Sequence, residues 1–298
     1  MREYKLETGS APKITVITAC VNASRTIEQT LRSVLDQGYP NLEYIIIDGG
    51  SEDGTLEIVE RYGTHLAAAI SEPDNGVYDA FNKGLALATG DLIGILNADD
   101  FYAPWTFERV AEVYASHPEY DVFFGKVAVI DEGKKRWKVY SIGSERGLVD
   151  SMSTPHPAVF LPGRTYGKWG FFDDSYKVAG DWDYVLGLYM DGASFYPINE
   201  VLTAFRDSGV SSLLSPRQLH ENRLVYFKYL DRTAALGRVA KMYLKYYGRR
   251  FLRISRTYDI YAAYRDRNLL NVEFSGEYGG NAETMWKSVD TRSVRRKG

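Results

Sequence analysis

The chain has 298 residues, of which 45% are hydrophobic and 25% are charged, and its formal net charge is -3. These values are ordinary for a globular protein and allow one large domain, with or without an appendage. Because a basic excess is missing, the chain offers no overall electrostatic case for binding nucleic acid. The single cysteine, Cys20, excludes an internal disulfide framework and a cysteine-rich zinc site, and it favours a reducing compartment.

Residues 1–12 are polar and lack the apolar segment and the small-residue cleavage site of a secretion signal. No stretch of the sequence approaches the ~18 consecutive apolar residues that a membrane-spanning helix needs. We therefore expect a cytoplasmic protein with a short polar leader at residues 1–12.

Strand-like and helix-like segments alternate through the first third of the chain. Short apolar runs predict strands at residues 14–19, 42–47, 65–70 and 91–96. Apolar residues at helical spacing predict helices at residues 24–35, 53–62 and 77–88. This alternation is typical of an α/β protein in which helices cover both faces of a mostly parallel sheet.

The pattern changes after Pro104. A helix is expected to end near residue 117, and residues 122–130 and 136–142 flank a turn at 131–134, which predicts antiparallel hairpins. From residue 216 onward, arginines and lysines mix with tyrosines and leucines in helical segments, and the last stretch is polar and glycine-rich. We place a boundary near Ser215.

Three polar loops follow predicted parallel strands, at residues 20–22, 48–54 and 97–100. In open α/β sheets, ligands bind outside the carboxyl ends of the strands, where loops present side chains above a rigid floor. We therefore expect these loops to converge on one ligand site.

Asp99 and Asp100 end a buried strand and offer the hard oxygen ligands that a divalent cation beside a nucleotide diphosphate requires. An aspartate at this place can also cap a following helix, but Pro104 indicates that the next helix begins several residues later. Asn97 points to the same side of the strand exit and is a candidate to support ribose or metal.

Other polar residues have a structural and a functional interpretation. Asp48 can accept a hydrogen bond from a ribose or a base, although residues 48–54 also have the composition of a tight turn and a helix cap. Asp74 and Lys83 can hold ribose and phosphate, or they are a turn residue and a solvated lysine. His156 borders the part of the site where a second substrate, the acceptor, is expected to bind. Alternatively, it is a structural histidine fixed by its turn.

Asp181 precedes the apolar helical run VLGLYM, as a helix cap does. Transfer of a group to a hydroxyl, however, needs a carboxylate to take the proton, and Asp181 is the candidate for this general base. Residues 206–211, beginning with Arg206, either order a loop over the phosphates of a bound nucleotide, the donor of the transferred group, or form a surface turn.

Five segments, in this order, carry a family resemblance: ITVITACVN, LEYIIIDGGSEDGT, SEPDNGVYDAFNKGLALATGD, IGILNADD and GFFDDSYKVAGDWDYVLGL. Together they resemble the family 2 glycosyltransferases, inverting enzymes of the GT-A fold, over residues 13–210. The resemblance implies an α/β fold with a mostly parallel central sheet flanked by helices and followed by a C-terminal helical appendage. It also implies an enzyme that moves a sugar from a nucleotide-diphosphate sugar to an acceptor hydroxyl with Mn²⁺ or Mg²⁺, in bacterial cell-surface glycan assembly.

The resemblance assigns roles to residues that match the motifs of the family. Asp99 binds the metal and the donor diphosphate, and Asp181 is the catalytic base. The remaining donor-site positions are Thr18, Ala19, Asn22, Asp48, Asp74, Lys83, Asn97 and Ala98, and those near the acceptor or in its loops are Asp100, His156, Trp182 and Arg206.

The sequence departs from the family pattern in three ways. Many members carry two consecutive acids after the second strand, where this chain has Asp48 and Gly49, so its recognition of the nucleotide base either differs or rests on other groups. The first acid of the metal motif is Asn97, which lowers the local negative charge. The Gln-x-x-Arg-Trp signature of processive members is missing, which favours an enzyme that adds a single sugar.

These observations predict a GT-A catalytic domain at residues 13–214, with a nucleotide-sugar-binding half at 13–101 and an acceptor-binding half at 102–214. The expected donor is a UDP-sugar, with dTDP- and GDP-sugars as alternatives, and the acceptor is a glycan or a lipid-linked hydroxyl. The basic, aromatic region at 215–298 suits contact with anionic lipid at the inner face of the membrane. A solvated helical pair or a contact in a homo-oligomer would explain the same region.

Two rival functions start from the same residues. A sugar nucleotidyltransferase would need a glycine-rich phosphate loop with Arg or Lys after the first strand, and residues 19–24 lack one. A catalytically inactive sugar-nucleotide-binding protein is less attractive, because candidates for both the metal ligand and the base are present.

Overall fold

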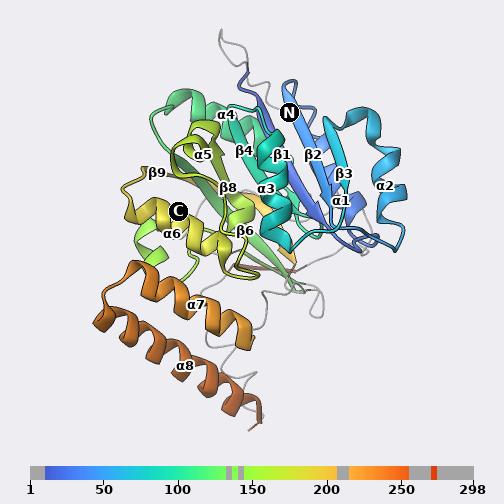
Figure 1. Ribbon diagram of the computed structural model, residues 1–298. Coiled ribbons are helices and arrows are strands. Elements are labelled where there is room, and N and C mark those ends of the chain that lie inside the picture. Colours follow the sequence, from blue (N-terminus) through green and yellow to red (C-terminus); the bar gives the residue numbers. More distant parts are fainter. Residues whose placement is uncertain (1–10, 132–135, 140–143, 207–214, 255–269, 274–298) are drawn as a thin grey trace.

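The computed structural model describes residues 11–131, 136–139, 144–206, 215–254 and 270–273 (Figure 1). Most of the predicted leader, the turn after Asp131, the loop after Arg206 and the polar tail lie outside these residues.

Four parallel strands form the first half of a large sheet, in the order β3, β2, β1, β4. Their bounds are β1 Ile14–Cys20, β2 Leu42–Asp48, β3 Ala68–Ser71 and β4 Leu92–Asn97. Each strand ends one residue later than the apolar pattern predicted. The reason is that the polar residues at the ends still pair through their backbones, as Cys20 does with Asp48.

Helices α1 (Ile27–Leu35), α2 (Thr55–Arg61) and α3 (Val77–Leu87) connect these strands. Helix α1 begins three residues after the predicted start at Ser24 because the preceding backbone is bonded elsewhere. The Ala23 N–H donates to Thr55 Oγ1 (2.8 Å) and the Ser24 N–H to Asp53 Oδ2 (3.1 Å). These bonds join the loop after β1 to the loop after β2.

The second half of the sheet continues from β4 through β8, β6, β7 and β10, with antiparallel neighbours throughout. Strand β9 runs parallel to β6 and pairs with the short β5. The bounds are β5 Phe101–Tyr102, β6 Val122–Asp131, β7 Arg136–Val139, β8 Val159–Pro162, β9 Phe195–Arg206 and β10 Leu270–Glu273. The helical elements of this half are α4 Thr106–Ser116, η3 Glu145–Val149, η4 His156–Ala158, α5 Gly163–Trp169 and α6 Gly180–Met190, and a short η1 (Gly63–His65) precedes β3.

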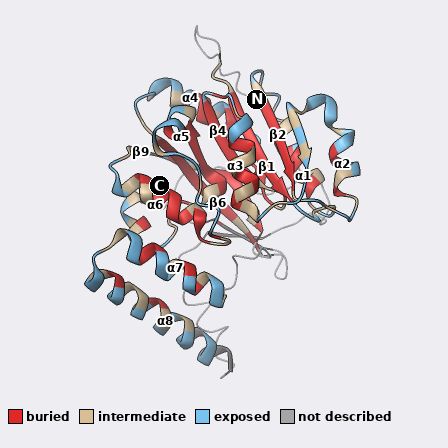
Figure 2. Ribbon diagram, in the orientation of Figure 1, coloured by how far each residue is buried: buried red, intermediate tan, exposed pale blue. Residues whose placement is uncertain are grey.

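Two apolar layers sandwich the sheet. The strands between them, such as β1, β2 and β4, are largely buried (Figure 2). Successive residues of a strand face opposite sides, so Val16 packs into the layer under α1 and α4 while Ile17 packs into the layer under α3 and α6. In β2, Ile46 and Ile47 divide in the same way. The central strands are therefore apolar on both faces, and their polar residues remain at the ends.

Helices α7 (Pro216–Tyr229) and α8 (Arg232–Ile254) follow β9, with α7 next to α6 and α8 beyond it (Figure 1). Ser215, at the predicted boundary, caps α7 by accepting a hydrogen bond from the Gln218 N–H (3.1 Å). Leu219 and Val225 of α7 nevertheless belong to the same apolar layer as α6. The division of the chain into domains stays a prediction. Within the described residues, no helix has both the length and the apolar character that crossing a membrane requires.

Candidate active site

Polar residues gather where the parallel strands end. Ala19 of β1 pairs with Asn97 of β4, and Cys20 pairs with Asp48 of β2. Neighbouring strands lie ~4.8 Å apart, so the loops that follow them begin side by side. The chain order of the strands reverses between β1 and β4, and such a reversal is where open α/β sheets bind their ligands.

Asp48 is buried and organises its own loop. Its carboxylate accepts hydrogen bonds from the N–H groups of Gly50 (3.0 Å) and Ser51 (2.9 Å), and from the hydroxyls of Ser51 and Ser71. Burial raises the pKa of Asp48, but the hydrogen bonds outweigh burial and leave the pKa below its ordinary value. The carboxylate is ionised and already surrounded by donors, with which a nucleoside would have to compete.

A second carboxylate reaches this loop from Asp74, between β3 and α3. Its Oδ1 accepts a hydrogen bond from the Gly76 N–H (2.8 Å), and its Oδ2 occupies the space that a side chain at position 49 would fill. The acid that the family pattern carries after Asp48 is thus missing from the sequence at Gly49. The Asp74 carboxylate, from a different loop, lies in the space beside it.

Asn22 ties the loop after β1 to the loop after β2. Its N–H donates to Ser51 Oγ (2.8 Å), and its side-chain oxygen accepts from the Glu52 N–H (2.9 Å). Its φ of 51° lies in the left-handed region, which asparagine tolerates better than most residues.

Thr18 is not at the edge, contrary to the prediction. Strand β1 continues to Cys20, so Thr18 lies wholly buried inside the strand, with its hydroxyl 3.1 Å from that of Tyr44. Its side chain belongs to the core, and the residue of β1 nearest to the β4 exit is Ala19.

Lys83 lies on α3 and is already paired. Its ammonium is 2.8 Å from Glu72 and 3.4 Å from Asp79, and it donates to the Pro73 carbonyl (3.2 Å). The hydrogen bond to Glu72 outweighs burial and raises the pKa of Lys83. The lysine holds the segment before α3, and binding a phosphate would require it to leave these partners.

The loop after β4 is anchored from two directions. The Thr30 hydroxyl of α1 bonds to the carbonyls of Ala98 (2.9 Å) and Asp100 (2.7 Å). From the end of β9, the guanidinium of the buried Arg206 donates to the Asp99 carbonyl. Arg206 therefore fixes the backbone that carries Asp99, while the loop that follows Arg206 lies outside the described residues.

Asp99 and Asp100 are adjacent but differ in environment. Burial raises the pKa of Asp99, although a hydrogen bond from its own backbone and the nearby charge of Arg206 act in the opposite direction. Asp100 is completely buried, and burial and then the charge of Asp99 raise its pKa well above the usual range. Asp100 thus favours the neutral acid and belongs to the interior of the loop, whereas Asp99 is the carboxylate at its surface.

The side chains around Asp99 suit a metal ion that also takes ligands from a bound phosphate. Among the described residues, no three His, Cys, Asp or Glu side chains gather closely enough to hold a metal by themselves. Mg²⁺ is commonly held by one or two carboxylates together with substrate phosphates. Asp99 fits this arrangement because its carboxylate is desolvated and forms no ion pair with a described residue.

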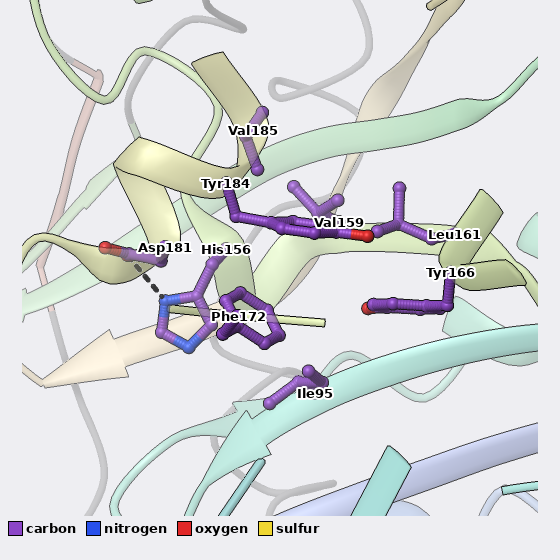
Figure 3. A pocket seen from close by; sticks show the side chains of 9 residues that line it. All are labelled: Ile95, His156, Val159, Leu161, Tyr166, Phe172, Asp181, Tyr184 and Val185. Carbon is purple, nitrogen blue, oxygen red and sulfur yellow. Dashed lines mark ion pairs between the residues drawn. The ribbon is translucent and has the colours of Figure 1, made fainter. Parts of the chain in front are cut away.

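Asp181 lies in the first turn of α6, and His156 connects it to the loop after β4 (Figure 3). His156 Nδ1 is 3.2 Å from Asp181 Oδ2, and His156 Nε2 is 3.5 Å from Asn97 Nδ2. An amide nitrogen only donates, so Nε2 of His156 accepts from Asn97, and Nδ1 faces the Asp181 carboxylate. Asp181 Oδ1 accepts a further bond from the Tyr78 hydroxyl (3.1 Å).

A small cavity lies beside this pair. Asp181 and His156 stand at one end of it, and Leu161 and Tyr166 stand at the other (Figure 3). The cavity is lined by Ile95, His156, Val159, Leu161, Tyr166, Phe172, Asp181, Tyr184 and Val185. The base candidate thus borders polar donor loops on one side and an apolar, aromatic surface on the other.

Trp182 does not face an acceptor. It is buried, its indole N–H donates to the Leu148 carbonyl (2.7 Å), and its ring packs edge-on against Tyr226. Trp182 was expected near the acceptor because it follows Asp181 in the sequence, but consecutive helical residues point in different directions.

Residues 15–177 match the model of glycosyl transferase family 2, which is more than half of the chain. The chain belongs to glycosyl transferase family 2. The glycosyltransferase is 30% identical over 188 residues to the PGL/p-HBAD biosynthesis glycosyltransferase of Mycobacterium bovis, covering 62% of this chain and 72% of the relative. It is 31% identical over 213 residues to a glycosyltransferase of Mycobacterium tuberculosis, covering 70% and 80%.

Solved structures confirm the predicted GT-A fold of the glycosyltransferase. S. aureus TarS 1–349 in complex with UDP-GlcNAc matches with a TM-score of 0.61 at 18% identity, over 79% of this chain and 73% of TarS 1–349. The mannosyltransferase PcManGT from Pyrobaculum calidifontis, in complex with GDP-Man and Mn²⁺, matches with a TM-score of 0.54 at 20% identity, over 73% and 64%.

Sequence reasoning missed Tyr78. This tyrosine is almost fully buried on α3, 103 residues before Asp181, and it has the helical spacing of an ordinary core residue. Burial, followed by the charge of Asp181, raises its pKa well above the usual range, so the hydroxyl remains a donor. Tyr78 differs from other core residues only in its hydroxyl, which points at the Asp181 carboxylate, and no sequence pattern predicts that direction.

We expect Gly49→Ala to lower the free energy of unfolding by about 1 kcal/mol, because the new methyl group must displace the pinned Asp74 carboxylate. Gly63→Ala is the matched control, because nothing lies within 4 Å of a methyl group there. Urea unfolding of both variants measures the difference. In the Asp74→Ala background the cost of Gly49→Ala should disappear, and equal midpoints for the two glycine variants would contradict the contact.

Proposed function

We propose that this glycosyltransferase transfers a sugar from a nucleotide-diphosphate sugar to an acceptor hydroxyl in one step, with inversion at the anomeric carbon. The observation that carries the proposal is the chain of contacts from Asp181 through His156 to Asn97, at 3.2 Å and 3.5 Å. It joins a candidate base to the end of β4, from which the loop with Asp99 begins. Base and leaving group can therefore act on the same anomeric carbon from opposite sides.

Asp181 removes the proton of the acceptor hydroxyl, and the oxygen attacks the anomeric carbon on the face opposite the diphosphate. Tyr78 donates to the Asp181 carboxylate, His156 Nδ1 contacts it at 3.2 Å, and together they hold its orientation. Asp99 is the residue that would hold Mn²⁺ or Mg²⁺, whose charge stabilises the departing diphosphate. No residue is required as a covalent nucleophile, and burial together with the charge of Asp48 raises the pKa of the Cys20 thiol, so that it stays protonated.

A UDP-sugar is the donor that we propose first, with dTDP- and GDP-sugars as alternatives. TarS, which shares the fold, binds UDP-GlcNAc, and PcManGT binds GDP-Man with Mn²⁺. We propose a glycan or a lipid-linked hydroxyl as acceptor, in the assembly of a bacterial cell-surface glycan. The apolar cavity beside Asp181 and the mycobacterial relative in PGL/p-HBAD biosynthesis support this assignment.

Asp181→Asn should lower turnover by about 10³-fold and leave donor affinity unchanged, because the amide keeps the size of the side chain but cannot accept the proton. Turnover is measured as nucleotide diphosphate released from each UDP-, dTDP- and GDP-sugar of a panel, with Mn²⁺ or Mg²⁺ present. Asp191→Asn, at the exposed C-terminal end of the same helix, is the control and should behave as wild type. Wild-type turnover in Asp181→Asn would remove Asp181 from the role of base.

Asp99→Asn should abolish the effect of metal on donor binding. In calorimetric titrations with UDP, EDTA should weaken binding to the wild-type chain by about tenfold, whereas the variant should bind equally weakly with Mn²⁺ and with EDTA. Asp36→Asn, at the exposed end of α1, is the control for the change of charge. A metal response of wild-type size in Asp99→Asn would show that the cation is held elsewhere.

We also propose that the protein is cytoplasmic and contacts the inner face of the membrane through α8. An apolar stripe on its outer side is exposed at Leu236 (52%), Leu244 (76%), Tyr247 (61%) and Phe251 (68%). The 23 residues of this helix include no Asp or Glu, and exposed lysines and arginines flank the stripe. An apolar stripe flanked by basic residues matches the boundary between anionic headgroups and acyl chains.

The wild-type chain should float with vesicles of phosphatidylcholine and phosphatidylglycerol, and high salt or pure phosphatidylcholine should reduce the bound fraction. The Leu244→Ser, Phe251→Ser double variant should bind at least about tenfold less because it lacks the most exposed apolar side chains. Leu87→Ser, which alters an exposed leucine on α3, serves as the control. Equal flotation of all three proteins would contradict membrane contact through α8, and a dimer lost only in the double variant would identify an oligomer contact.

A further inference from the structure

Helix α6, which carries Asp181 in its first turn, has no side-chain cap of its own. Its N-cap residue is Ala179, which has no side-chain acceptor, so the position of the helix start depends on the segment before it. The carboxylate of Glu221 on α7 acts one step earlier, on the segment that leads into the helix. It binds the N–H groups of Lys177 (3.0 Å), Val178 (2.8 Å) and Ala179 (2.9 Å).

A second contact from α7 reaches the other side of Asp181. The Lys228 ammonium lies 3.0 Å and 2.7 Å from the two carboxylate oxygens of Asp183, and the Tyr229 hydroxyl donates to the Asp183 carbonyl (3.1 Å). Asp183 is buried, and burial raises the pKa of its carboxyl while the Lys228 charge lowers it. Helix α7 thus holds the backbone just before Asp181 and the residue two positions after it.

These polar contacts are not needed merely to attach α7. Leu219, Val225 and Tyr226 already pack into the apolar layer shared with α6. A buried charge contributes little net stability compared with an apolar side chain of similar size, because it loses its hydration. Hydrogen bonds do fix distance and direction, and the three bonds to Glu221 fix the start of α6.

Catalysis is sensitive to this placement. Asp181 Oδ2 is 3.2 Å from His156 Nδ1 and its Oδ1 is 3.1 Å from the Tyr78 hydroxyl, so a small shift of the first turn of α6 breaks both contacts. A displacement of ~1 Å of a catalytic group can lower a rate by ~10²-fold. His156 and Tyr78 belong to other elements and do not move with α6.

We propose that helix α7 is part of the catalytic apparatus, with Glu221 as a positioning residue that sets Asp181 through the start of α6, supported by Lys228 from the same helix. The proposal rests on the proposed role of Asp181 as the base. It assigns the first of the C-terminal helices to the reaction rather than to an appendage.

Glu221→Gln tests the proposal, because glutamine keeps the size but retains one acceptor oxygen where the carboxylate has two, so at least one of the three N–H groups loses its partner. We expect kcat to fall by about tenfold or more while the KM for the donor stays within about twofold, because the donor loops lie on other strands. Turnover is measured with the sugar nucleotide that the panel identifies, well below the unfolding midpoint. Glu60→Gln, an exposed acid on α2, is the matched control.

Glu221→Leu removes every acceptor and should lower kcat further than Glu221→Gln, and circular dichroism of both variants establishes that each is folded. Wild-type kcat in folded Glu221→Gln would overturn the proposal, as would a loss explained entirely by a smaller folded fraction. Asp181→Asn separates the two levels of inference. If it keeps full turnover, the proposed base is wrong; if it is inactive while Glu221→Gln is fully active, only the positioning role is wrong.

Discussion

The backbone pairing of β1 with its two neighbours is the constraint on which the site depends. Cys20 pairs with Asp48 and Ala19 pairs with Asn97, so the loops that follow three parallel strands start from one edge. Apolar residues on both faces of these strands keep the edge in place between two packed layers. The loops after β1 and β2 are joined through Asn22 and Ser51, and Thr30 of α1 anchors the loop after β4 at Asp100. A rigid floor and cross-linked loops leave few carboxylates free to meet a ligand.

Aspartates in this small region differ because their surroundings differ. Asp48 stays ionised because hydrogen-bond donors surround it, and Asp100 favours the neutral acid because it is buried beside another carboxylate. Asp99 lies between these cases, desolvated and anchored through its backbone by Arg206. Asp181 comes from a helix much later in the chain and reaches the same place through His156. The environment of each carboxylate, rather than its residue type, separates a loop organiser from a candidate ligand or base.

The parallel half of the fold could be predicted because apolar runs and helical spacing depend on neighbours in the sequence, and the family motifs located Asp99 and Asp181. Side-chain direction could not be predicted. Thr18 is inside the strand and Trp182 faces the core, because one residue of register or one helical step decides burial. No sequence pattern pointed to the role of Glu221, because its partners are backbone N–H groups 42 to 44 residues earlier. The many basic residues of its segment indicated a surface for lipid or for another protein instead.

The carboxylate of Asp74 beside Gly49 has a consequence for how such a loop can vary. Two acids cannot occupy that volume together, so a chain with an acid at position 49 has no room for Asp74 in its present conformation. An acid introduced at position 49 therefore has to be accompanied by a shorter residue at position 74 or by a changed path of the segment before α3.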